Sequence, residues 1–175
     1  MADPYIQTVM ERIETELKTE VASGQSLSFM VGEPQAGIVI SDAPPDDERR
    51  KNYRKYRIDI YPDPDESLEE IPRLGNRVER QMRIGFSVWK KAQRKRKWLF
   101  FSDSTDTTQG IGVAEVTNLV FDVLRNNTLN SLVQMKSGRQ FTRPTMEETN
   151  NALVARQDFV FMCESLQTID SDGVP

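Results

Sequence analysis

Two segments of the chain alternate apolar and polar residues with the two-residue period of a β-strand, and this alternation constrains the fold more than any other feature. The two apolar rows are Tyr56, Ile58 and Ile60, followed by Met82, Ile84, Phe86 and Val88. Successive side chains of a strand point to opposite faces, so each segment predicts a half-buried strand. Arg57 and Asp59 are expected on the solvent side of the first strand, which Pro62 ends. We expect the two strands to pair antiparallel, with a long excursion between them.

Helical periodicity appears in two other segments, 3–21 and 111–125, where apolar residues recur every three or four positions. The stripes are Ile6, Val9, Ile13, Leu17 and Val21, and then Val113, Val116, Leu119, Val120, Val123 and Leu124. Asp3 can cap the first helix, and Pro4 suits its first position because the missing N–H would be unpaired there anyway. A further short helix is expected at 128–133.

Four more segments predict strands or extended chain: 38–40, 97–101, 137–144 and 153–164. In the last of them apolar residues occupy both faces, which is typical of a central strand covered by a helix on one side. The predicted fold class is therefore α+β, a mostly antiparallel sheet with two main helices packed on it and long charged loops. We expect a single domain over 1–165 and a flexible C-terminal tail at 166–175.

The chemistry available to the 175 residues is narrow, because the chain has one cysteine and no histidine. Histidine triads, zinc fingers and disulfide frameworks are excluded by that count. Cys163 lies in the most apolar predicted strand, so we expect a buried core residue rather than a nucleophile. No glycine-rich phosphate loop or nucleophile elbow occurs. We therefore expect no enzyme, and no catalytic, cofactor-binding or metal-binding residues.

The overall charge and hydropathy indicate an ordinary globular protein. The net charge is -4, so general affinity for nucleic acid is not expected. No apolar run approaches the ~18 residues that a membrane-spanning helix needs. The N-terminal residues do not read as a signal peptide, so we expect synthesis in the cytoplasm and no membrane partner.

The strongest local charge feature is the basic run 90–97, in which six of eight residues are lysine or arginine and which Trp89 and Trp98 flank. Such a run could meet phosphates while the tryptophans stack on bases. It could equally be a solvated hairpin end that blocks strand association, or a docking element for an acidic protein surface. The sequence leaves these interpretations open.

An acidic segment at 62–70 and a second charged loop at 42–51 complete the pattern. The acidic spacing does not match a calcium loop, so solvated carboxylates are the expected interpretation. Opposite charges at separate places on one chain could pair within a molecule, or in a head-to-tail contact between identical copies. The candidate interface residues are Arg49, Arg50, Lys51, Asp63, Asp65, Glu66, Lys90, Lys91, Arg94, Lys95, Arg96 and Lys97.

Four segments in this order carry a family resemblance: the helix 3–21, the strand 53–61, the helix 111–125 with 128–132 after it, and the strand 151–161, where small and polar residues lead into an aromatic and aliphatic alternation. Together they resemble the tail terminator family of long-tailed bacteriophages, also called minor tail protein U or tail-to-head joining proteins. The likeness is one of pattern and order over most of the chain, without a signature motif. The connector 62–80 and the extended region 86–101 are longer than compact members need.

The resemblance implies a structural virion protein of the tail and neck, made in the bacterial host's cytoplasm. Such a protein forms a hexameric ring on the last ring of tail-tube subunits, stops tube polymerisation and presents a platform for the head connector. DNA would meet it at most nonspecifically, in the lumen. Two alternatives stay open: another neck, head-completion or sheath-associated terminator protein, or a nucleic-acid-binding accessory protein that uses the segment 89–98.

Overall fold

The structure is a computed structural model. It describes residues 4–22, 24–45, 53–63, 68–73, 77–92, 99–101, 110–125, 127–129, 132–149, 152–165 and 169–170. The elements in chain order are α1 (Pro4–Glu20), the 3-10 turns η1 (Ser28–Met30) and η2 (Pro34–Gly37), β1 (Ile38–Ile40), β2 (Tyr56–Pro62), β3 (Leu68–Arg73), β4 (Arg77–Ala92), α2 (Val113–Arg125), β5 (Val133–Phe141), β6 (Thr145–Thr149), β7 (Ala152–Ser165) and β8 (Ile169–Asp170).

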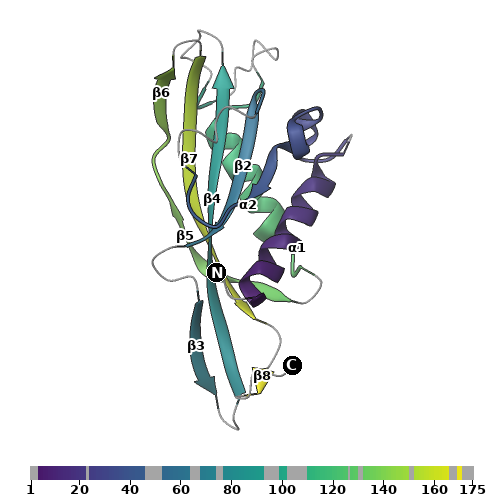
Figure 1. The fold of residues 1–175 in the computed structure, drawn as a ribbon, viewed down its shortest axis with the longest axis vertical. Coiled ribbons are helices and arrows are strands. Elements are labelled where there is room, and N and C mark those ends of the chain that lie inside the picture. Colours follow the sequence, from purple (N-terminus) through teal and green to yellow (C-terminus); the bar gives the residue numbers. More distant parts are fainter. Residues whose placement is uncertain are drawn as a thin grey trace.

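The described strands form one elongated sheet, and the predicted α+β class is confirmed (Figure 1). Its main path runs β1-β2-β4-β7-β5, with β1 parallel to β2 and the other pairs antiparallel. The expected antiparallel pairing of β2 with β4 is confirmed. β7 lies between β4 and the edge strands β5 and β6, so the central strand predicted at 153–164 is confirmed too.

One end of the sheet forms an arm that projects past both helices (Figure 1). β2 and then β3 pair along one side of β4, while β7 and then β8 pair along its other side. We call β3, residues 77–82 of β4 and β8 the arm. The acidic connector was predicted as a loop, which is wrong for 68–73, since these residues form β3. Within the predicted tail, β8 is a strand paired with β4.

The core lies between one face of the sheet and the two helices. α1 packs on β1 and β2, whereas α2 packs on β7 and β4. At the centre the rings of Phe86 and Phe159 stack with their centroids 4.6 Å apart, and the edge of Phe121 from α2 meets Phe159. The apolar rows predicted for β2 and β4 are all fully buried here, as the alternation requires.

Tyr5 connects the start of α1 to the base of the arm. Its hydroxyl donates to the carbonyl of Leu132 over 3.0 Å and shares a 2.7 Å hydrogen bond with Ser165 Oγ. The Arg80 guanidinium lies 5.7 Å from the centroid of its ring. Burial raises the pKa of Tyr5, which further favours the protonated hydroxyl that makes these hydrogen bonds.

Two predicted elements are wrong because backbone groups find other partners. No strand forms at 99–101: the carbonyls of Leu99 and Phe100 accept from the first N–H groups of α2. No helix starts at Thr128, because Leu129 adopts a left-handed conformation (φ 48°) and donates its N–H to Asn127 Oδ1 over 2.7 Å. The next described strand, β5, begins at Val133.

Candidate functional site

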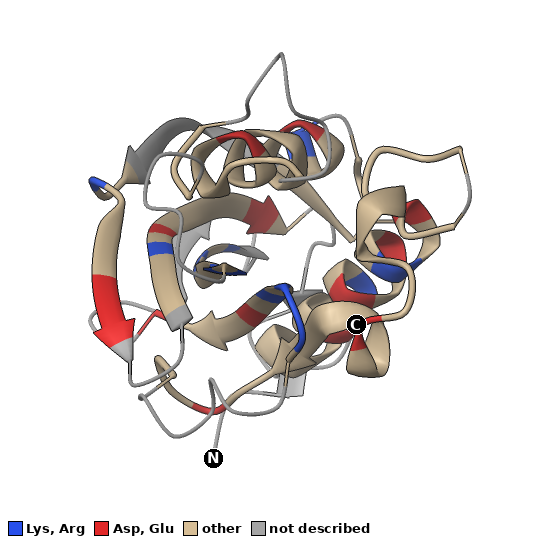
Figure 2. Cartoon of the chain, turned by 90° about the horizontal axis from the view of Figure 1, so that it is seen from above, with Lys and Arg blue, Asp and Glu red and all other residues tan. Residues whose placement is uncertain are grey.

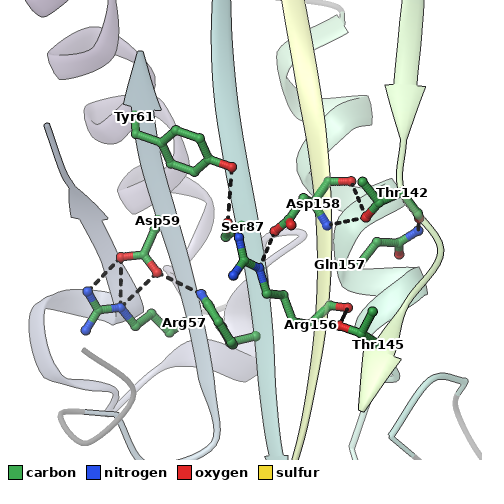
Figure 3. A network of polar contacts seen from close by, with 10 residues as sticks. Arg57, Asp59, Tyr61, Ser87, Thr142, Thr145, Arg156, Gln157 and Asp158 are labelled. Atoms are coloured by element: carbon green, nitrogen blue, oxygen red, sulfur yellow. Dashed lines mark hydrogen bonds and ion pairs between the residues drawn. The ribbon is translucent and has the colours of Figure 1, made fainter. Parts of the chain in front are cut away.

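The face of the sheet opposite the helices carries a polar network, which we call the second face (Figure 3). Arg57 and Asp59, expected in solvent, are only 7% and 0% exposed, so that prediction is wrong. The Arg57 guanidinium donates to both carboxylate oxygens of Asp59, with a shortest contact of 2.6 Å. The indole N–H of Trp89 donates to the same carboxylate over 2.8 Å. Asp59 thus holds together neighbouring strands β2 and β4.

Aromatic rings close part of the second face over these polar groups. Tyr53, Trp89 and Val154 form a small apolar cluster of their own. The ring of Tyr61 lies against Gly85, where a Cβ would come within 2.2 Å of Tyr61 Cε2. A glycine at this strand position therefore makes room for the aromatic cover. Trp89 is 1% exposed, so the predicted stacking platform for bases is wrong for this residue.

A second ion pair continues the network across β7. Arg156 Nε lies 2.6 Å from Asp158 Oδ1, and the guanidinium sits 4.7 Å from the centroid of the Trp89 ring. Arg156 also donates to Ser87 Oγ, which shares a 3.2 Å hydrogen bond with the Tyr61 hydroxyl. Burial raises the pKa of Tyr61. These groups bind one another, so the network links three strands rather than presenting a nucleophile or a general base.

The sequence-predicted interface residues that the structure describes do not form one exposed patch. Asp63 is buried and pairs with Arg83 over 2.9 Å, contrary to its expected place in a solvated loop. Lys90 and Lys91 belong to β4 rather than to a loop, and Lys90 is fully buried. The remaining predicted residues, Arg49, Arg50, Lys51, Asp65, Glu66, Arg94, Lys95, Arg96 and Lys97, lie outside the described residues.

Lys90 points to the helix side of the sheet, beneath the segment that leads into α2. Its ammonium lies 3.5 Å from the Gly110 carbonyl oxygen and 5.9 Å from the centroid of the Tyr56 ring. Burial, and then the charge of Lys55, lower the pKa of Lys90 to about 8, although Glu115 opposes the shift. Burial raises the pKa of Tyr56 to about 12, and its hydroxyl donates to the Ile111 carbonyl. The buried lysine thus gives the stability of the fold a measurable pH dependence.

The stability of the wild type relative to a Lys90→Met variant is expected to rise with pH. The pKa of Lys90 is about 8 in the folded chain against 10.5 for the free group, so the unfolded state binds more protons between these values. Stability from this group is fully present above 10.5 and is lost as the pH falls through 8. Urea unfolding at pH 7 and pH 9.5 should show a relative gain of roughly 2 kcal/mol. A difference that stays constant over this range would contradict the assigned burial.

Sequence reasoning missed Glu33, which organises the start of β2. Its carboxylate accepts the backbone N–H groups of Arg54, Lys55 and Tyr56 over 2.8–2.9 Å. No local pattern could reveal this role, because the donors lie 21–23 residues away along the chain. Cys163, by contrast, is buried as predicted, and burial raises the pKa of its thiol to about 12. A thiolate nucleophile is therefore not available there.

No sequence pattern pointed to the edge strand β6, which lies on the outer rim of the sheet with an acidic end (Figure 2). Residues 145–148 are all exposed, including Met146, Glu147 and Glu148. Both faces of the strand therefore meet solvent. Among the described strands, only β7 pairs with β6. We call residues 145–149 the β6 edge.

Other kinds of site are not found in the described part of the chain. It contains no group of three or more Cys, Asp or Glu residues placed to hold a metal ion. None of its helices has the length and apolar character needed to cross a membrane. Comparison of the sequence with models of protein families gives no match, and comparison with curated proteins gives none either.

Proposed function

We propose that the chain is a structural virion protein without catalytic activity, which caps the tail tube of a long-tailed bacteriophage, ends its polymerisation and joins it to the head connector. The observation that carries the proposal is that the described polar groups of the second face pair with one another. The charged side chains of the second face bind one another. The β6 edge and the arm, by contrast, lie at the margins of the sheet. Such a molecule is suited to contacts with other proteins rather than to turnover of a small molecule.

The two ends of the sheet differ, and this asymmetry supports a terminating role. The arm occupies one end, and the β6 edge lies toward the other (Figure 1). A filament stops growing when the last subunit matches the growing face on one side and offers a different surface on the other. In this proposal six copies form a ring in the virion neck, with the tube protein on one side and the connector on the other.

The test is tube length. Tube protein that polymerises in the presence of this chain should give shorter tubes, each carrying a ring at one end in negative-stain images. An equal mass of an unrelated acidic protein serves as the control. Tubes of unchanged length without end rings would contradict the proposal.

A nucleic-acid-binding accessory role is less well supported. Trp89, one of the two tryptophans on which that interpretation depended, is buried and donates its indole N–H to Asp59. Counterion release predicts that binding of a basic run to DNA weakens steeply as salt increases. Tight DNA binding with such a salt dependence, in a protein that ignores tube ends, would favour this alternative. Other neck proteins and sheath-associated terminators would also form rings, so the same imaging experiment tests these alternatives.

A further inference from the structure

Three successive backbone N–H groups at the start of β2 bind a single carboxylate. The donors are Arg54, Lys55 and Tyr56, and they bind the two carboxylate oxygens of Glu33 over 2.8, 2.8 and 2.9 Å. Consecutive N–H groups that point to one place form a concavity that binds anions. Two of the three donors belong to cationic residues, and Arg54 is exposed. Geometry and charge therefore favour a carboxylate at this place over a neutral acceptor.

The turn that carries Glu33 is strained. Gln35 and Ala36 have φ values of 53° and 56°, in the left-handed region that residues other than glycine rarely occupy. The N–H of Ala36 donates to the Glu33 carbonyl over 3.1 Å, so the strained residues directly adjoin the carboxylate-bearing residue. Strain of this kind persists only where surrounding contacts hold it, and it is frequent at ligand clamps and switches. The hydrogen bonds of the Glu33 carboxylate are such contacts.

The same turn lies at the surface of the molecule. Residues 31, 32, 34 and 35 are exposed, and Glu33 itself is half-buried. A carboxylate from outside can therefore reach the three N–H groups when the turn moves away. A tethered group such as Glu33 normally competes at a high effective concentration. The strain of Gln35 and Ala36 opposes the closed arrangement and so reduces this advantage.

We propose that the N–H groups of residues 54–56 form a binding site for a carboxylate of a partner protein, and that Glu33 closes this site in the free chain. When the partner binds, its carboxylate replaces that of Glu33, and the turn at 34–37 leaves its left-handed conformation. Each N–H group exchanges one carboxylate acceptor for another, so no donor is left without an acceptor. Capture of carboxylates by backbone N–H groups is a known mode of peptide recognition. The site is independent of the tube-capping role, because it is built from contacts within one chain.

Glu33→Ala opens the site, and sodium acetate is the probe. In this variant the amide NMR signals of residues 54–56 should shift saturably as acetate replaces sodium chloride at constant ionic strength. The wild type should respond at least about tenfold more weakly, because the tethered Glu33 competes for the same donors. Glu20→Ala is the matched control. The Glu20 carboxylate accepts one N–H, from Ser26 over 3.2 Å, so its loss should give no saturable response at Ser26.

Hydrogen exchange tests the opening of the turn in the wild type. If Glu33 releases its donors while the sheet stays folded, the amides of 54–56 should exchange at least about tenfold faster than that of Phe86 in the middle of β4. Gln35→Gly keeps the carboxylate and suits the left-handed φ without strain. Protection of the amides of 54–56 should therefore rise in this variant by about threefold or more.

Four results would overturn the inference: no saturable acetate response in Glu33→Ala, an equal response in Glu20→Ala, exchange at 54–56 only through unfolding of the whole chain, or unchanged protection in Gln35→Gly. The last two remain decisive if Glu33→Ala does not fold. Any of these results leaves the tube-length experiment unaffected, and tubes of unchanged length would leave the carboxylate site standing.

Discussion

Replacing Asp59 with asparagine is expected to lower the free energy of unfolding by about 3–5 kcal/mol. The substitution keeps the size of the side chain and removes the charge. Arg57 would then be a buried guanidinium without its carboxylate, and Trp89 would lose a charged acceptor. Desolvation of an uncompensated charge is the dominant cost, because Arg57 is only 7% exposed. Guanidinium chloride unfolding of the purified variant measures the loss.

Asp158→Asn is the matched control for this prediction. Arg156 and Asp158 repeat the same spacing of two residues on β7 and the same 2.6 Å contact. Their side chains, however, are 24% and 28% exposed, so water can solvate the arginine that remains. We expect a loss of about 0–1 kcal/mol, typical of an exposed pair. Equal losses for the two variants would show that burial does not set the strength of these pairs.

The contrast between these two pairs explains one limit of sequence reasoning. Alternation assigned Tyr56 and Ile58 to one face of β2 and Arg57 to the other. This assignment is confirmed, since Tyr56 and Ile58 belong to the main core whereas Arg57 binds Asp59. It could not say whether the second face meets solvent. That depends on the ring of Tyr61 and on the cluster around Tyr53, whose positions follow from packing between strands rather than from local pattern.

Elements with strong periodicity were predictable, and elements that depend on distant partners were not. Both helices, the strand β2 and residues 82–88 of β4 follow from spacing, and β7 follows from its apolar residues on both faces. β3 could not be predicted, because its charged residues resemble a loop and only pairing with β4 makes it a strand. The short helix predicted at 128–133 failed for a comparable reason, since an asparagine side chain satisfied the backbone in a turn instead.

The candidate site was harder to predict than the fold. The basic run was recognised as the strongest charge feature, but its first residue, Lys90, is buried within β4. The β6 edge was missed, because the exposure of Glu147 and Glu148 is a property of the sheet's rim and leaves no signature in sequence. Charge patterns thus drew attention to 90–97, while strand order was needed to find the exposed rim at β6.

Gly112→Ala is expected to lower the free energy of unfolding by about 3 kcal/mol, through lack of space rather than through backbone strain. A Cβ at this position would lie 2.4 Å from the carbonyl oxygen of Phe100 and from the Cα and N atoms of Phe101. Backbone atoms cannot move aside as a flexible side chain can, so the segment 99–101 would have to separate from α2. That movement breaks the hydrogen bonds from Val113 N to Leu99 O and from Ala114 N to Phe100 O.

Gly32→Ala separates the two possible causes. Gly32 has a left-handed φ of 90°, and no atom lies within 4 Å of the place that a Cβ would take, so alanine there meets strain without a clash. We expect a loss of about 1 kcal/mol from that strain. Gly112 is the reverse case, since its φ lies outside the left-handed range and other atoms occupy the space around it.

If Gly112→Ala unfolds no more easily than Gly32→Ala, the close packing of 99–101 on the start of α2 does not stabilise this end of the sheet. A larger loss confined to Gly112→Ala, with protection from hydrogen exchange falling at Val113 and Ala114, would show that it is.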